Sequence, residues 1–154
     1  MKVNLFIVRH GHSPFIGQDD FSRPLSSEGE QQALNVGDFI AKHITKGRTK
    51  LITSAAQRTV TTTENITESL PAAQVIKNPK LYTASVGDWC QAISEHATDN
   101  LILVGHNPTV SQLYQYLTQS DPQGFTPATT GHLILDIASD GLTLPAQAQQ
   151  IYCP

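Results

Sequence analysis

The chain has 154 residues, of which 39% are hydrophobic and 15% are charged, and its ten basic and thirteen acidic residues give a formal net charge of −3. This composition excludes a disordered chain, which would be poorer in apolar residues, and a nucleic-acid-binding protein whose affinity depends on general basicity. The length predicts a single domain over residues 1–154 that folds without a metal or a disulfide.

The predicted elements alternate between strands and helices. Val3–Val8 is a mostly apolar run that predicts a buried strand, and the polar segment from Pro14 to Leu25 predicts a surface loop. Ser27 and Glu30 have the spacing of a capping box, which predicts a helix that begins there and carries an apolar face as far as Ile44. The elements expected after it are a strand at 51–53, a helix from 54 to about 70, a strand at 74–77, a helix from 86 to about 96, a strand at 101–104, a helix over about 108–117 and two more exposed strands at 132–137 and 149–152.

This order predicts an α/β fold. Alternating strands and helices require crossover connections, which give a three-layer sandwich with a mostly parallel central sheet and helices on both faces. Ligands bind such sheets beyond the carboxyl ends of the strands. A functional site is therefore expected where the two most buried strands end, after Val8 and after Val104.

Both of these strands are followed by a histidine. His10 and His106 each lie beside a glycine, and Arg9 comes directly before His10. Arg58 lies in the first turns of the helix after the strand at 51–53, at the same edge of the sheet, where a helix N-terminus itself favours anions. Two imidazoles and two guanidiniums at one edge predict a site for a tetrahedral oxyanion.

These residue types suit phosphoryl transfer. A neutral His10 is a competent nucleophile towards phosphorus, and the flanking arginines are expected to lower its pKa and keep a lone pair free. Arg9, Arg58 and His106 are expected to bind phosphoryl oxygens, with His106 as a protonated donor. A metal site made of His10, His12 and His106 is the alternative, which the two arginines disfavour because they repel a cation.

The amino terminus and the cysteines predict a cytoplasmic location. The first apolar stretch is interrupted by Asn4 and ends at Arg9, so it is too short for a signal peptide or a membrane span. Cys90 and Cys153 lack the spacing of metal ligands, and each is interpreted as an apolar packing residue in a reducing compartment. We therefore expect no membrane association, no metal and no cofactor.

Four motifs in order resemble those of the histidine phosphatase superfamily, which is also called phosphoglycerate mutase-like. The motifs are IVRHG at 7–11, RPLSSEG at 23–29, TSAAQRT at 53–59 and VGHNP at 104–108, and the resemblance extends from residue 3 to about residue 137. It implies that His10 is phosphorylated in a covalent intermediate and that Arg9, Arg58 and His106 form the phosphate pocket. The short chain and its motifs resemble most the phosphohistidine phosphatase branch, the SixA type.

The chain departs from the family pattern at several positions. His12 stands where many relatives have Glu, and Ile16 stands where many have a phosphate-binding Asn. No acidic residue follows the strand at 74–77, where relatives often have a general acid, and Asp88 is not expected to take that role. The missing acid favours cleavage of a P–N bond, because an imidazole leaving group needs less help from a proton donor than an alcohol does.

We therefore expect a metal-independent hydrolase that removes phosphate from phosphohistidine on a partner protein, such as a phosphotransfer domain, through phosphorylated His10. Two alternatives stay open: a phosphatase for a small phosphomonoester, and a phosphoprotein-binding module without turnover. No nucleic-acid partner is expected. A monomer is expected, because no helical face carries a surplus apolar stripe.

Overall fold

In the computed structural model, which describes residues 1–17 and 19–154, the strands form one six-stranded sheet in the order β3-β2-β4-β1-β5-β6. Their bounds are β1 Lys2–Arg9, β2 Thr49–Thr53, β3 Gln74–Lys77, β4 Asn100–Gly105, β5 Thr130–Ala138 and β6 Gly141–Tyr152. The strands β1 to β4 run parallel to one another, whereas β5 pairs antiparallel with both β1 and β6. The sheet is therefore mixed and mostly parallel, as the sequence predicts.

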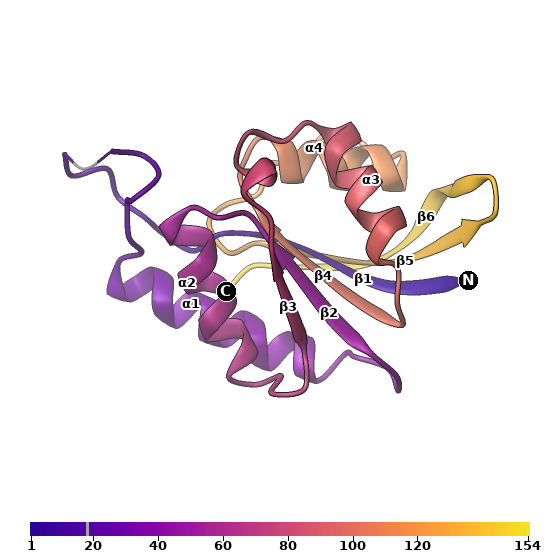
Figure 1. Ribbon diagram of the computed structural model, residues 1–154, viewed down its shortest axis with the longest axis horizontal. Helices are drawn as coiled ribbons and strands as arrows, with labels where there is room; N and C mark the ends of the chain where they lie inside the picture. The colour runs from indigo at the N-terminus through magenta and orange to yellow at the C-terminus, as the bar shows by residue number, and fades with distance from the viewer. Residues whose placement is uncertain (18) are drawn as a thin grey trace.

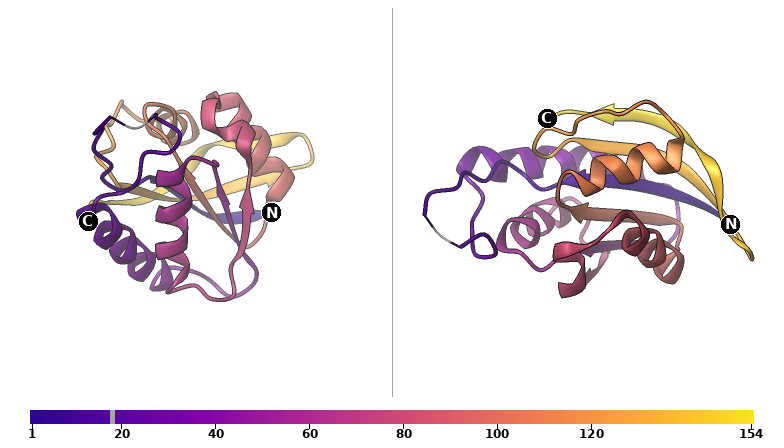
Figure 2. Two further views of the ribbon diagram at one scale, coloured as in Figure 1. Left: turned by 60° about the vertical axis from the view of Figure 1, so that its left-hand side comes forward. Right: turned by 90° about the horizontal axis from the view of Figure 1, so that it is seen from above.

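The helices cover both faces of this sheet. Helices α1 (Ser27–Ala41) and α2 (Gln57–Thr67) lie on one side, and α3 (Val86–His96) and α4 (Thr109–Thr118) lie on the other (Figure 1). A short 3₁₀ helix, η1 (Pro79–Thr83), precedes α3. Figure 2 shows the resulting three layers from two further directions, which confirms the predicted sandwich. Over the described residues, no helix has the length and apolar character that crossing a bilayer requires.

The pleat of β1 divides its side chains between two cores. Leu5 and Ile7 pack with residues of α3 and α4, whereas Phe6 and Val8 pack with residues of α1 and α2. All four side chains are fully buried. A strand that is covered on both faces has no polar side, and this is why β1 is an almost uninterrupted apolar run in the sequence.

The start of α1 differs from the prediction. The capping box of Ser27 and Glu30 is wrong: the N-cap is Ser26, whose hydroxyl accepts a hydrogen bond from the backbone N–H of Gly29 at 3.1 Å. The backbone N–H of Ser26 also donates to the carbonyl oxygen of His12 at 3.0 Å. This contact joins the helix start to the segment after β1, and no local sequence pattern encodes it.

Two glycines allow the same segments to cross closely. A Cβ at Gly29 would lie 2.2 Å from the carbonyl oxygen of His12, and a Cβ at Gly11 would lie 2.5 Å from the carbonyl oxygen of Gly29. Both contacts are with backbone atoms, so no side-chain rotation can relieve them. The crossing therefore holds the start of α1 against the residues that follow His10.

Gly29→Ala is expected to lower the free energy of unfolding by about 1–3 kcal/mol, as overpacking of a filled position does. The matched control is Gly124→Ala, because nothing lies within 4 Å of a Cβ at Gly124. Its effect should stay within about 0.5 kcal/mol. Urea unfolding of both variants measures the difference, and equal stabilities would contradict the close crossing.

Candidate active site

The pairing of β1 with β4 brings the two predicted histidines together. Arg9 at the end of β1 pairs with Gly105 at the end of β4, so His10 and His106 follow side by side at the carboxyl edge of the sheet. Their ring centroids are 5.5 Å apart. The backbone N–H of His10 donates to the carbonyl oxygen of Gly105 at 3.1 Å, which continues the pairing one step beyond the strands.

The hydrogen bonds of His10 identify its attacking nitrogen. Nδ1 lies 2.8 Å from the carbonyl oxygen of Gly11, and because a carbonyl only accepts, Nδ1 carries the proton. Nε2 therefore has the lone pair, and Nε of Arg58 donates to it at 3.3 Å. Burial is the main reason that the pKa of His10 is lowered to about 3, and His106, Arg58 and Arg9 lower it further. The ring is neutral at neutral pH, although the arginines contribute less than the sequence suggested.

Arg58 is the second residue of α2, and its guanidinium is buried. The pairing of β2 with β4 places the N-terminus of α2 at the same edge of the sheet as His10. While Nε of Arg58 faces His10, Nη1 donates to the carbonyl oxygen of Asp20 at 2.7 Å and Nη2 to its carboxylate at 3.1 Å. Arg58 thus joins the candidate nucleophile to the loop between β1 and α1.

His106 is held through one of its two ring nitrogens. Nε2 lies 2.6 Å from Oγ of Ser54, which in turn lies 2.8 Å from Oγ1 of Thr59. Nδ1 is buried and has no partner among the described residues. Burial lowers the pKa of His106 to about 4, so the ring is neutral before phosphate arrives, unlike the protonated donor expected from the sequence. A neutral imidazole ring still has one N–H donor. When the Ser54 hydroxyl donates to Nε2, the N–H of the ring is on Nδ1.

Arg9 lies at the same edge of the sheet, and among the described residues its side chain makes no hydrogen bond to either histidine. Its Nη1 donates to the carbonyl oxygen of Phe125 at 2.9 Å, and its Nε is buried without a partner in the part of the chain that the structure describes. Burial lowers the pKa of Arg9, followed by the charges of Arg23 and Arg58. Three guanidiniums are therefore close enough to interact, and together they make the site strongly cationic.

Three residues that were not predicted as site residues belong to this cluster: Asp20, Tyr82, and Ser54 of the TSAAQRT motif. The carboxylate of Asp20 accepts from Nη2 of Arg23 at 3.1 Å and from the hydroxyl of Tyr82. The Tyr82 ring, in η1, meets the ring of His106 edge-on at a centroid distance of 5.5 Å. Ser54 and Tyr82 follow the carboxyl ends of β2 and β3, so the strand-end rule could have indicated them. Asp20 lies in a loop and has no such signal.

Among the described residues, the side chains of the two departures from the family pattern near β1, His12 and Ile16, make no hydrogen bond to this cluster. Nδ1 of His12 is 2.7 Å from Oγ of Ser26, so this ring contacts the start of α1. The side chain of Ile16 is 70% exposed. Within residues 1–17 and 19–154, no three His, Cys, Asp or Glu side chains gather as metal ligands would.

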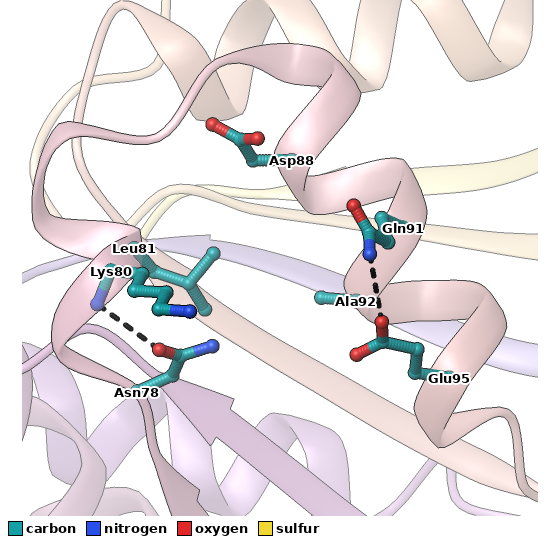
Figure 3. A pocket seen from close by; sticks show the side chains of 7 residues that line it. All are labelled: Asn78, Lys80, Leu81, Asp88, Gln91, Ala92 and Glu95. Carbon is teal, nitrogen blue, oxygen red and sulfur yellow. Dashed lines mark hydrogen bonds between the residues drawn. The ribbon is translucent and has the colours of Figure 1, made fainter.

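A hollow of about 260 Å³ between η1 and α3 is separate from the histidine cluster. Figure 3 shows the seven residues that line it, which are Asn78, Lys80, Leu81, Asp88, Gln91, Ala92 and Glu95. Its amides already have partners, since Asn78 accepts from the backbone N–H of Lys80 and Gln91 donates to Glu95. Asp88 caps α3 by accepting from the backbone N–H of Ser85, so it belongs to this hollow rather than to the histidines.

Comparison with known proteins identifies the family. Residues 5–92 match the histidine phosphatase superfamily (branch 1). The chain belongs to this superfamily. This histidine phosphatase is 23% identical to a phosphohistidine phosphatase SixA homolog of Haemophilus influenzae over 146 residues, which cover 87% of this chain and 89% of the relative.

Solved structures agree on the fold of this histidine phosphatase. A protein histidine phosphatase SixA complexed with tungstate is similar with a TM-score of 0.75 and 21% identity, over 98% of this chain and 96% of the other. A phosphoglycerate mutase from Plasmodium falciparum is similar with a TM-score of 0.70 and 15% identity, over 97% and 89% of the two chains. The fold is therefore phosphoglycerate mutase-like, as the motifs implied.

Three histidines whose pKa is lowered should make this histidine phosphatase sensitive to acid. Besides His10 and His106, His132 has a pKa lowered to about 4, mainly by burial and further by His43. Each folded pKa lies below the unfolded value of about 6.5, so the unfolded chain takes up protons that the folded chain does not. Stability is therefore complete above about pH 6.5 and falls as the pH drops from there towards 4.

Urea unfolding between about pH 7 and pH 4.5 should show this loss of stability, at up to about 1.4 kcal/mol per pH unit for each histidine. His132→Gln, which keeps a donor near Asn4 but does not titrate, should make the dependence on pH less steep. A free energy of unfolding that stays constant over this range would contradict the neutral state of the three rings.

Proposed function

We propose that this histidine phosphatase hydrolyses phosphohistidine on a partner protein, such as a phosphotransfer domain. The observation that carries the proposal is the buried, neutral His10, whose unprotonated Nε2 accepts from Nε of Arg58 at 3.3 Å. A nucleophilic lone pair beside a guanidinium is the arrangement that transfer of a phosphoryl group to nitrogen requires. The proposed site residues are His10 as nucleophile, and Arg9, Arg58 and His106 as phosphate ligands.

In the first step, Nε2 of His10 attacks the phosphorus in line while Arg9, Arg58 and His106 bind the phosphoryl oxygens. A P–N bond to His10 forms as the P–N bond of the substrate breaks. The imidazole of the partner leaves with the bonding electron pair and takes up a proton from solvent. The two guanidiniums neutralise charge on the transferring group, and this positioning supplies most of the rate gain.

In the second step, water hydrolyses the phosphorylated His10. The water oxygen forms the new P–O bond, the bond from phosphorus to Nε2 breaks, and the protons of the water remain with phosphate and solvent. Nε2 regains its lone pair while Nδ1 keeps the proton that Gly11 accepts. The enzyme thus returns to its starting tautomer without a further proton transfer at His10.

The state of Asp20 favours phosphohistidine over a phosphate ester. The hydrogen bond from Tyr82 is the main reason that the pKa of Asp20 is lowered to about 2, and Arg58 and Arg23 lower it further. The same bond raises the pKa of Tyr82. Neither group is then a ready proton donor, which an alcohol leaving group needs more than an imidazole does. The names of the relatives, a phosphohistidine phosphatase and a protein histidine phosphatase, point to the same substrate.

Parallel assays on a phosphohistidine-bearing protein and on a panel of sugar phosphates test this proposal. We expect phosphate release from the phosphoprotein to be the faster by a wide margin. Faster hydrolysis of a sugar phosphate would instead support a phosphatase for small phosphomonoesters. Binding of the phosphoprotein with neither phosphate release nor a labelled His10 would support the non-catalytic module. The expected monomer and cytoplasmic location stay predictions.

A further inference from the structure

Asp20 places a carboxylate in a site that is otherwise built for an anionic ligand. Its side chain accepts from the hydroxyl of Tyr82, from Nη2 of Arg58 at 3.1 Å and from Nη2 of Arg23 at 3.1 Å. Its backbone carbonyl accepts from Nη1 of Arg58 at 2.7 Å. Both terminal nitrogens of the Arg58 guanidinium thus donate to this one residue.

A phosphoryl group needs the donors that Asp20 occupies. Nε of Arg58 faces Nε2 of His10, so a phosphoryl group placed for attack by His10 binds the guanidinium next to that contact. The nearest remaining donor is Nη2, which the Asp20 carboxylate holds. A carboxylate and a phosphoryl dianion on one nitrogen would bring like charges into contact, which strongly opposes binding. Phosphate that binds the edge of Arg58 formed by Nε and Nη2 would therefore compete with the Asp20 carboxylate for Nη2.

The surroundings of Asp20 permit such a movement. Its side chain is 49% exposed and lies in the loop before α1, whereas the side chain of Arg58 is only 6% exposed and fixed in α2. Arg23 already holds the second carboxylate oxygen, and Nε of Arg23 is buried without a partner among the described residues. A rotation of the carboxylate towards Arg23 would exchange one guanidinium for another and free Nη2 of Arg58, while Nη1 keeps its hydrogen bond to the Asp20 carbonyl.

We propose that Asp20 is an internal competitor of phosphate. Its carboxylate holds Arg58 in the empty site, gives way to the phosphoryl group, and returns to displace the product phosphate. The inference rests on the proposed function only in requiring that phosphate bind at Arg58. Asp20 contacts no reacting atom and acts through Arg58, so it is a positioning residue that sets the affinity for phosphate and the rate of product release.

Asp20→Asn tests this proposal, because it keeps the shape of the side chain and removes its charge. Calorimetric titration with inorganic phosphate should show binding that is tighter by roughly tenfold or more. With a phosphohistidine protein as substrate, KM should fall, and kcat should fall as well because phosphate leaves more slowly. A purely structural loss would weaken phosphate binding and raise KM, so the direction of both changes is diagnostic.

Asp19→Asn is the matched control. It makes the same change of charge one residue away, where the carboxylate accepts only from the backbone N–H of Ser22 at 3.1 Å among the described residues. The affinity of the Asp19→Asn variant for phosphate should stay within about twofold of the wild type, because the charge of Asp19 is exposed and screened by salt. Tyr82→Phe removes one donor to Asp20 and should tighten phosphate binding by a smaller factor than Asp20→Asn does.

The outcomes separate the two proposals. Unchanged or weaker phosphate binding by Asp20→Asn would overturn the competition while leaving the proposed function intact. Tighter binding by Asp20→Asn, in an enzyme that does not hydrolyse phosphohistidine, would support the competition and overturn the proposed substrate. If neither the wild type nor Asp20→Asn binds inorganic phosphate, both proposals fail.

Discussion

His10→Ala is expected to abolish turnover, with a loss on the order of ten-thousandfold or more, because it removes the ring nitrogen that faces Nε of Arg58. Alanine removes the attacking atom and leaves the two arginines and His106 in place. Binding of phosphate should therefore persist while its release from phosphohistidine stops. Steady-state phosphate release and calorimetric phosphate binding on the same preparation measure the two effects separately.

Trapping adds a direct test of the covalent step. Wild-type enzyme mixed briefly with labelled substrate should carry the label on His10, and the His10→Ala variant should carry none. His96→Ala, in the last turn of α3, is the control for loss of an unrelated imidazole and should keep wild-type activity. A His10→Ala protein with wild-type turnover would end the mechanism.

Arg58→Ala is expected to lower kcat/KM on the order of a hundredfold or more, since the loss of one preorganised donor to a transferring group costs about that much. Arg58→Lys should recover only part of this loss. A lysine has a single nitrogen and lacks the planar fork by which Nε of Arg58 faces Nε2 of His10 while Nη2 is available for a phosphoryl oxygen that displaces Asp20.

The control for Arg58 is Arg48→Ala. Arg48 is exposed at the turn before β2, and its backbone N–H, which the substitution keeps, donates to the carboxylate of Asp99 at 2.9 Å. Its kcat/KM should stay within about twofold of the wild type, as for most surface substitutions. If Arg58→Ala behaved like Arg48→Ala while both variants remained folded, phosphate would have to bind elsewhere on the molecule.

Much of this site could be predicted because its main parts lie at strand ends. The apolar runs of β1 and β4 are strong signals, and a parallel sheet brings their carboxyl ends to one edge. His10 and His106 could therefore be placed near each other without coordinates, and the register of Arg9 with Gly105 makes them neighbours. Strand β3 and helix α3 also have the bounds that their sequence patterns predict.

The parts that could not be predicted depend on contacts between segments without a regular pattern. Asp20 reaches Arg58 from a loop that has no regular sequence pattern. Its negative charge would also argue against a position near a phosphate site. Ser26 rather than Ser27 caps α1 because of its contact with His12. The strand β6 is much longer than the predicted 149–152, since it lies at the edge of the sheet, where exposed polar residues weaken the alternation.

The crossing of Gly11 and Gly29 bears on how such an enzyme can diversify. Together with the bond from Ser26 to His12, and that from the Ser13 hydroxyl to the carbonyl oxygen of Pro24 at 2.6 Å, it ties the two ends of the loop to one another. Phe15 and Ile16, beyond these ties, are 69% and 70% exposed. Substitutions at Phe15 and Ile16 can therefore accumulate without disturbing the ties that hold the start of α1 beside His10.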